Sequence, residues 1–218
     1  MLRAVTLNIA LGLLAAQSTA SCEVALLLAI DVSGSVDAGE FDLQAVGLAE
    51  ALRDPEVAEI LARSQAALAV VQWSGVGNQE LTIPWRRMLS AAEIEAFSRS
   101  ARAMPRRYTF RGTAVGEALE FSRRQFAPVP DCKRKVIDIS SDGAENEGPL
   151  VATLRLRTLA DGIEINALAI EAFSLSITEF YRRQVISPHG FVITAQGHRD
   201  YLRAIRAKLL RELQVPVG

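Results

Sequence analysis

Runs of apolar residues alternate with segments of helical periodicity along most of the chain. Short segments of strand character predict six strands, at 24–30, 67–73, 80–85, 136–140, 163–170 and 191–194, and the continuous apolar run at 24–30 is typical of a buried parallel strand. Apolar positions at helical spacing predict helices at 40–52, 56–63, 91–104, 114–126, 150–159, 177–185 and 199–213. Strands that alternate with helices indicate an α/β fold with right-handed crossovers.

The predicted architecture is a doubly wound, mostly parallel six-stranded sheet with helices on both faces. The second and third strands are joined by a short turn rich in glycine, so they should pair antiparallel and give the sheet one antiparallel edge strand. Ligands of doubly wound sheets bind beyond the carboxyl ends of the strands. The loops that follow these strand ends are therefore where we look for chemistry.

The first twenty residues have the pattern of an export signal. Arg3 gives a positive start, residues 4–16 are mostly apolar, and Ser18 and Ala20 are small residues at the −3 and −1 positions of a cleavage site. The apolar run is too short to span about 30 Å of hydrocarbon as a helix, and no later run is longer, so we expect no transmembrane span. We therefore expect a signal peptide at 1–20 and one exported domain at 21–218, periplasmic or extracellular.

A lipid anchor is the alternative for the start of this domain. Residues 19–22 loosely resemble a bacterial lipoprotein box, in which Cys22 would carry the lipid. The branched apolar residue usual three positions before that cysteine is missing, which favours the simple signal peptide.

Composition and charge exclude several classes of protein. Half of the residues are hydrophobic and 22% are charged, as in a globular domain rather than a disordered chain. The 24 Lys and Arg residues balance the 25 Asp and Glu residues, which leaves a net charge of −1 and no global electrostatic case for binding nucleic acid. Basic residues gather between positions 86 and 135, mostly in clusters typical of a solvated surface.

Three loops at the predicted carboxyl ends of strands carry oxygen donors. The first strand runs into Asp31, Ser33 and Ser35, Thr113 stands just before a helix, and Asp142 follows the fourth strand. Each loop alone could simply cap the helix behind it. Together they form a set of hard oxygen ligands at one edge of the sheet, which suits Mg²⁺ or a similar divalent ion.

With these loops the chain resembles a von Willebrand factor type A (vWA) domain, and the loops match that family's metal-ion-dependent adhesion site (MIDAS). The match covers residues 23–214 in element order. The resemblance implies that Ser33 and Ser35 bind a metal directly, that Asp31 and Asp142 bind it directly or through water, and that Thr113 engages in the ligand-bound state. The cofactor would be Mg²⁺, or another divalent cation such as Mn²⁺ or Ca²⁺. The chain is also similar to a group of exported bacterial vWA-like proteins of the DUF1194 type.

This resemblance implies an adhesion module that binds a protein partner through an Asp or Glu carboxylate and is not an enzyme. The carboxylate would complete the metal's coordination shell. Arg106, Arg107 and Arg111 stand near the Thr113 loop and would favour an acidic partner with salt-sensitive association. The sequence does not define an oligomeric state.

Two other functions remain as alternatives. A hydrolase or phosphatase could use the Asp31 loop, although a dehalogenase-like phosphatase needs a second carboxylate where Ser33 stands. A serine hydrolase needs a G-x-S-x-G nucleophile elbow, which residues 32–36 do not match. A vWA domain could also use its metal for stability alone, without binding a ligand.

The two cysteines fit the same resemblance. In the vWA sheet the first and fourth strands are parallel neighbours, and Cys22 and Cys132 precede Asp31 and Asp142 by similar distances. The resemblance thus implies a Cys22–Cys132 disulfide at the amino-terminal edge of the sheet, which an oxidising compartment allows. Two free thiols, or lipidation of Cys22, are the alternatives.

Other polar residues give weaker signals. Asp138 lies inside an apolar strand, where we expect it to be hydrogen-bonded to a neighbouring element rather than to support the metal. Glu145 and Glu147 are interpreted as loop residues that could border the metal face. His189 and His198 both lie beside glycine and are expected in surface turns.

Overall fold

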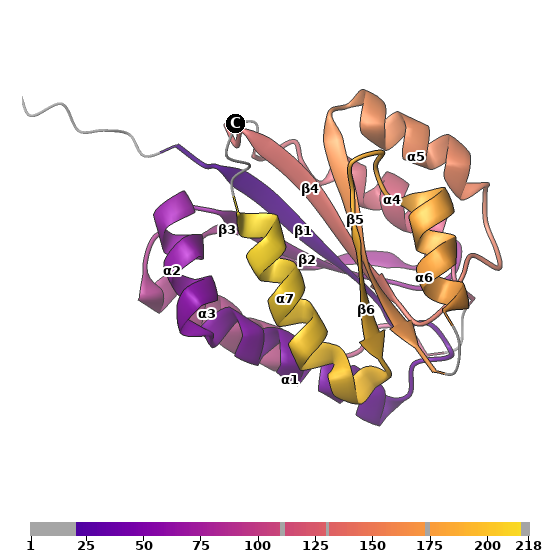
Figure 1. Ribbon diagram of the computed structural model, residues 1–218, viewed down its shortest axis with the longest axis horizontal. Coiled ribbons are helices and arrows are strands. Elements are labelled where there is room, and N and C mark those ends of the chain that lie inside the picture. The colour runs from indigo at the N-terminus through magenta and orange to yellow at the C-terminus, as the bar shows by residue number, and fades with distance from the viewer. Residues whose placement is uncertain (1–20, 110–111, 130, 173–174, 215–218) are drawn as a thin grey trace, which may run out of the picture.

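A single six-stranded sheet with β1 near its middle organises the molecule (Figure 1). The computed structural model describes residues 21–109, 112–129, 131–172 and 175–214. The strand order is β3-β2-β1-β4-β5-β6, and only the β2–β3 pair is antiparallel. The strands are β1 (Val24–Asp31), β2 (Ala67–Trp73), β3 (Gln79–Arg87), β4 (Arg134–Ser141), β5 (Ile163–Glu171) and β6 (Val192–Gln196).

Helices cover both faces of this sheet, as the sequence predicts. Helices α1, α2, α3 and α7 pack on one face, and α4, α5 and α6 pack on the other (Figure 1). The helices are α1 (Ala38–Arg53), α2 (Pro55–Ser64), α3 (Ala91–Arg102), α4 (Val115–Arg124), α5 (Val151–Ala160), α6 (Ser176–Phe180) and α7 (Tyr201–Leu213). A π-helical turn at Tyr181–Val185 continues α6, and a 3₁₀ turn at His198–Asp200 precedes α7.

The side chains of β1 explain why its sequence is apolar without interruption. Leu26 and Leu28 face the core under α1 and α7, whereas Leu27 and Ala29 face the core under α4 and α5. Because successive strand residues point to opposite faces, a strand covered on both sides has no polar face. The structure thus confirms the predicted doubly wound α/β fold.

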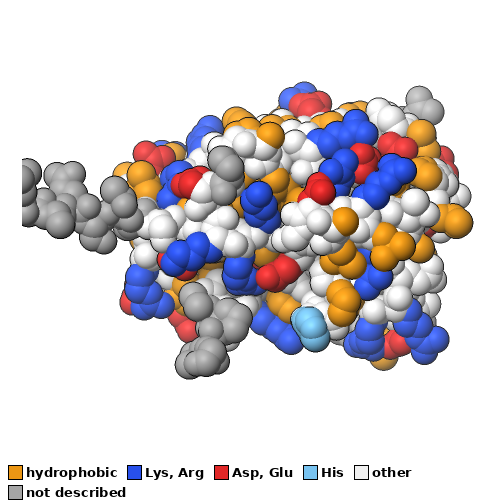
Figure 2. Space-filling model, turned by 90° about the horizontal axis from the view of Figure 1, so that it is seen from above, with side chains coloured by type: hydrophobic (Ala, Val, Ile, Leu, Met, Phe, Trp, Pro, Cys, Tyr) orange, Lys and Arg blue, Asp and Glu red, His pale blue; other side chains and the backbone are white. Residues whose placement is uncertain are grey.

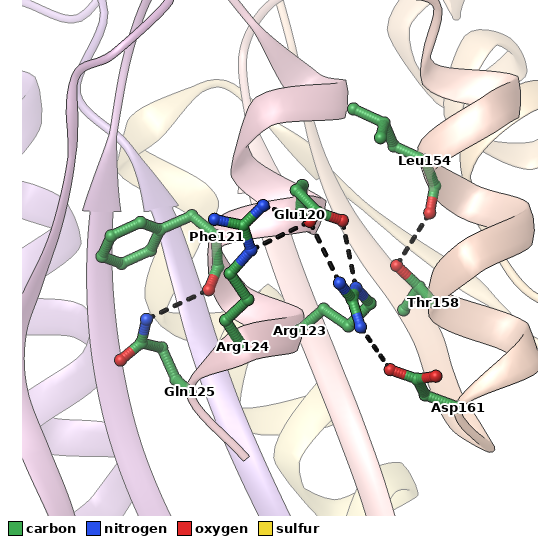
Figure 3. A network of polar contacts seen from close by, with 8 residues as sticks. All are labelled: Glu120, Phe121, Arg123, Arg124, Gln125, Leu154, Thr158 and Asp161. Atoms are coloured by element: carbon green, nitrogen blue, oxygen red, sulfur yellow. Dashed lines mark hydrogen bonds and ion pairs between the residues drawn. The ribbon is translucent and has the colours of Figure 1, made fainter. Parts of the chain in front are cut away.

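Helices α4 and α5 are tied to each other by one arginine (Figure 3). The guanidinium of Arg123 binds Glu120 on its own helix and Asp161 just beyond the end of α5. Hydrogen bonds from Arg123 and then Arg124, opposed by burial, lower the pKa of Glu120 to about 2. This polar contact holds the two helices of that face together beside their apolar contacts.

The amino-terminal edge of the sheet carries the cysteine pair. Cys22 and Cys132 form a disulfide bond across a sequence separation of 110 residues. The backbone N–H of Lys133 also donates to the carbonyl of Cys22 at 2.9 Å. The start of β1 is therefore joined to the start of β4, and the Cys22 sulfur is part of the disulfide.

Basic side chains of the middle of the chain are largely paired with acids. Arg87 binds Asp131 at 2.7 Å, and Arg134 binds Glu164 at 2.8 Å. Figure 2 shows Lys and Arg side chains spread over the face seen from above, with acidic and hydrophobic side chains between them.

In the described part of the chain, no helix has the length and apolar character needed to cross a membrane.

Candidate functional site

The candidate site lies where the strand order reverses. Strands β2 and β4 flank β1, and the register places Ile30 beside Ser140, so β1 and β4 end at the same level. At such a switch point the loops from neighbouring strands diverge to opposite faces and leave a crevice at the carboxyl ends. Asp31, the last residue of β1, and Ser141, the last residue of β4, are both buried at these strand ends.

Asp31 organises the loop that follows β1. One carboxylate oxygen accepts from the backbone N–H of Ser33 at 2.7 Å, and the other accepts from the hydroxyl of Ser141 at 2.5 Å. Burial, opposed by the hydrogen bond from Ser141 and assisted by the nearby charge of Asp142, raises the pKa of Asp31 to about 7. A buried carboxylate with this pKa is costly to ionise unless a cation approaches it.

Three hydroxyls and a second carboxylate converge beside Asp31. The hydroxyls of Ser33 and Ser35 lie 3.2 Å apart, and the Ser35 hydroxyl donates to Asp142 Oδ1 at 2.7 Å. The Thr113 hydroxyl lies 3.5 Å from that of Ser33. Ser33 and Thr113 are buried while Ser35 is exposed, so the cluster opens to solvent on one side. The structure brings all five predicted metal ligands together.

None of these hydroxyls caps a helix. Helix α1 is capped by Asp37, which accepts from the backbone N–H of Glu40 and receives the Glu40 side chain in return. Helix α4 begins after Ala114 and has no side-chain cap, so Thr113 does not play that part either. The capping interpretation of Ser35 and Thr113 is therefore wrong, and their hydroxyls face the cluster.

The β4–α5 loop holds Thr113 in place. The Thr113 N–H donates to Asn146 Oδ1 at 2.8 Å, and the Asn146 N–H donates to the Thr113 carbonyl at 3.0 Å. A Cβ at Gly112 would lie 2.6 Å from Asn146 Oδ1, and one at Gly143 would lie 3.2 Å from the Thr113 hydroxyl. Glycine at both positions lets the two loops approach.

A role for Asn146 was not predicted from the sequence, and Glu145 and Glu147 were predicted only as loop residues. Glu145 accepts from the N–H groups of Gly116 and Val151, and Glu147 accepts from the N–H of Val76 at 2.7 Å. Glu145 is partly buried and Glu147 is exposed, and both side chains bind backbone donors. A polar run directly after Asp142 was the available signal, but nothing in its spacing predicted which backbone groups it would meet.

Of the three arginines predicted near the Thr113 loop, the two that the structure describes make different contacts. Arg106 Nη2 donates to the carbonyls of Ser33 at 2.8 Å and Val32 at 3.2 Å, so its charge supports the loop that carries the hydroxyls. Arg107 Nη2 lies 2.8 Å from Glu80. Arg111 lies outside the described residues.

Tyr181 is a buried neighbour of the cluster that the sequence did not suggest. Its hydroxyl lies close to that of Ser141, and burial, with nearby Asp31 and Asp142, raises its pKa well above the usual range. Tyr181 opens the π-helical turn, a geometry often found at functional sites.

The donor set fits a hard divalent cation. Hydroxyl and carboxylate oxygens, with no thiolate or imidazole among them, are the ligands that Mg²⁺, Mn²⁺ and Ca²⁺ prefer. Across the described residues, no group of three or more His, Cys, Asp and Glu side chains could hold a metal. Asp138 is not part of it, because its carboxylate binds Lys208 of α7.

The histidines lie elsewhere. His189 is exposed in a turn, as expected. His198 is not: its side chain is 8% exposed, and its Nδ1 lies 3.1 Å from Glu40 at the start of α1.

A family model matches nearly the whole described chain. Residues 21–217 match the model of the family described as "Protein of unknown function (DUF1194)". The chain belongs to the DUF1194 family. None of the curated proteins compared with this DUF1194 chain matches it significantly.

Solved structures show that this DUF1194 protein has the vWA fold. The proximal thread matrix protein 1 of the mussel byssus superposes with a TM-score of 0.68 at 18% identity over 88% of this chain and 48% of its own. A vWA protein from Catenulispora acidiphila gives 0.64 at 19% identity over 88% and 43%. The pilus adhesin SpaC from Lactobacillus rhamnosus GG gives 0.63 at 14% over 87% and 30%. The DUF1194 chain thus spans about half or less of these proteins.

Proposed function

We propose that the protein is a metal-dependent binding module of the adhesion type. The observation that carries this proposal is the convergence of Ser33, Ser35, Thr113, Asp31 and Asp142 from three separate loops at the carboxyl ends of β1 and β4. Ser33 and Ser35 would bind a divalent ion through their hydroxyls, and Asp142 would bind it on the exposed side. Mg²⁺ is the first candidate, and Mn²⁺ and Ca²⁺ are the others.

The chemistry of the site favours a partner that presents a carboxylate. Neutral hydroxyls leave most of the ion's charge uncompensated, and the cluster opens to solvent at Ser35. A partner's Asp or Glu would complete the coordination shell and neutralise the ion. The metal would provide the attraction, because Arg106 and Arg107 already bind groups of this chain.

The structural neighbours support this type of function. One structure of the mussel proximal thread matrix protein has a zinc-occupied MIDAS motif, with a TM-score of 0.66 at 18% identity. SpaC is a pilus adhesin. We accordingly propose binding without turnover, by a protein exported through a signal peptide at 1–20 with its domain at 21–218. The disulfide supports an oxidising compartment, and N-terminal sequencing of the protein recovered from the periplasm would test the cleavage site.

The decisive experiment is calorimetric titration of the metal-free protein with Mg²⁺, Mn²⁺ and Ca²⁺. We expect saturable binding at one site, and we expect Ser33→Ala and Asp142→Asn to weaken it by at least tenfold. Asp42→Asn is the matched control, because Asp42 is exposed on α1 and outside the cluster. Titration heats equal to those of buffer for all three ions would overturn the proposal.

The partner's chemistry needs a second measurement. An array of short peptides that contain Asp or Glu should retain the protein with Mg²⁺ and release it with a chelator. Metal binding and a raised melting temperature without any metal-dependent peptide binding would instead identify a vWA domain in which the ion serves stability alone. Cleavage of phosphate or acyl esters that is lost in Asp31→Asn would support the hydrolase alternative.

A further inference from the structure

Three charged side chains are enclosed between α7 and the sheet, away from the proposed metal site. Lys208 lies on α7 with a side chain that is 0% exposed, and its Nζ is 3.0 Å from Asp138 Oδ1 on β4. Glu212, one helical turn further along α7, places Oε1 2.8 Å from the same nitrogen. The side chains of Asp138 and Glu212 are 1% and 0% exposed. An amine and two carboxyl groups are therefore held in contact and closed to solvent.

The cluster is not a balanced ion pair. Asp138 Oδ2 is buried and has no hydrogen-bond partner. Burial raises the pKa of Asp138 to about 7, and the neighbouring Glu212 adds to the rise against the attraction of Lys208. The Phe191 ring, with its centroid 4.8 Å from Lys208 Nζ, provides an apolar boundary on another side of the amine. A protonated Asp138 carboxyl is thus accessible near neutral pH, directly against a lysine nitrogen.

We propose that Lys208 and Asp138 condense to an intramolecular isopeptide bond between Nζ and Cγ, with Glu212 as the proton-transfer group. Glu212 takes one proton from the ammonium, and the free amine forms a nitrogen–carbon bond with Cγ of the protonated Asp138. The bond from Cγ to the hydroxyl breaks as Glu212 returns its proton to that oxygen. The second nitrogen proton passes to Glu212, and one water leaves. The products are an amide and a water molecule, so the step needs no outside reactant.

The surroundings favour this condensation over the separated ions. In water an ammonium and a carboxylate are strongly solvated, whereas here each lacks that solvation and the amide that replaces them is neutral. Asn166 donates to Glu212 Oε2 at 3.0 Å and lines an open cavity of about 480 Å³, whose wall also includes Phe191. The released water can leave through this cavity. The bond would join β4 to α7 covalently.

Mass spectrometry of the reduced full chain tests this proposal. We expect the protein to be lighter than its sequence by the mass of one water. After trypsin, peptide 136–155 should be joined to peptide 207–211, because modified Lys208 is no longer cleaved. Separate peptides, with cleavage after Lys208, would overturn the proposal and leave an ion pair. Loss of one ammonia, with peptide 158–182 joined to 207–211, would also overturn it, because Asn166 would then be the reacting group.

Variants test the part assigned to Glu212. Glu212→Gln preserves the side-chain shape and removes the proton acceptor, so we expect it to give the unlinked mass. Lys133→Arg is the matched control: Lys133 is exposed and binds Glu23, and this variant should stay linked. A linked Glu212→Gln would refute the role of Glu212. The peptides of the unaltered chain decide the bond itself, whether or not the variants fold, and none of these outcomes bears on metal binding.

Discussion

Two acidic clusters in this protein use similar residues but differ in what surrounds their carboxyl groups. At the carboxyl ends of the strands, Asp31 and Asp142 lie among neutral hydroxyls, and the group opens to solvent. Between α7 and the sheet, Asp138 and Glu212 enclose the ammonium of Lys208 and are closed to solvent. Burial raises the pKa of both Asp31 and Asp138 to about 7.

The difference lies in where the cation comes from. Asp138 has an amine partner within the chain, Lys208, whether the two stay an ion pair or condense as proposed. Among the described residues, Asp31 and Asp142 have neutral hydroxyl partners instead, which is the arrangement expected of a site that takes a metal from outside. Two carboxyl groups with similarly raised pKa values can therefore serve stability in one place and binding in another. The difference depends on one lysine, Lys208.

Removal of that lysine should have the largest effect on stability. In Lys208→Met, Asp138 and Glu212 stay buried without the amine that pairs with them or forms the proposed bond, and loss of one partner of a buried pair costs about 3–5 kcal/mol. Denaturant unfolding measures this change in the free energy of unfolding. Lys133→Met, which breaks the exposed pair with Glu23, should cost less than about 1 kcal/mol. Equal losses in the two variants would contradict the contrast between the clusters.

The pH dependence of stability, measured with and without Mg²⁺, should distinguish the open cluster of Asp31 and Asp142 from the closed cluster of Asp138 and Glu212. A carboxyl whose folded pKa is raised to about 7 stabilises the fold below its unfolded pKa of 3.8, and that contribution is lost as the pH rises through 7. The metal-free protein should therefore lose stability between about pH 4 and 7, by at most about 4 kcal/mol for Asp31.

Added Mg²⁺ should flatten this pH curve, because the ion favours the ionised carboxylates. Melting curves from pH 4 to 8 with Mg²⁺ or with a chelator measure the effect. Asp31→Asn should remove the difference between the two curves. If the unaltered protein gives identical curves with Mg²⁺ and with the chelator, Asp31 does not sense a metal.

Arg106 should support the open cluster only through its hydrogen bonds to backbone carbonyls. Arg106→Gln removes its hydrogen bonds to the carbonyls of Val32 and Ser33, and we expect a loss of about 1–3 kcal/mol in stability. Misplacement of the two serine hydroxyls should also weaken Mg²⁺ binding by about tenfold. Calorimetry compares it with Arg107→Gln, which removes only a pair with Glu80 and should leave Mg²⁺ affinity unchanged.

A lysine in the open cluster should make it resemble the closed one. Ser35→Lys places an ammonium beside Asp142 on the exposed side, where a pair contributes only about 0–1 kcal/mol to stability. The Mg²⁺-dependent rise in melting temperature should disappear, although the protein stays folded. A Mg²⁺ response as large as in the unaltered protein would show that the exposed side of the cluster is not where the ion binds.

Periodicity in the sequence predicted the fold because the four central strands, β1, β2, β4 and β5, are buried along most of their length. The apolar run of β1 and the short turn between β2 and β3 follow directly from local physics. The π-helical turn at Tyr181–Val185 was missed, since its residues also satisfy the spacing of an ordinary helix. Local patterns identify elements well, but they do not specify small departures in helix geometry.

For the candidate site, the sequence predicted the ligands better than their supports. Asp31, Ser33 and Ser35 share one loop and are recognisable by spacing. Asn146 and Arg106 act across loops through backbone groups, and no spacing rule relates them to the cluster. The partner of Asp138 was equally out of reach, because Lys208 lies 70 residues further along the chain and meets it only when α7 packs on the sheet.

The Cys22–Cys132 bond has a mechanical consequence. A partner held at the metal centre would pull on the carboxyl ends of β1 and β4, while Cys22 lies at the opposite end of the same two strands. Tension between these ends would run along β1 and β4 side by side. The disulfide would divide that tension between two strands, which would allow the domain to transmit force without unfolding from its first strand.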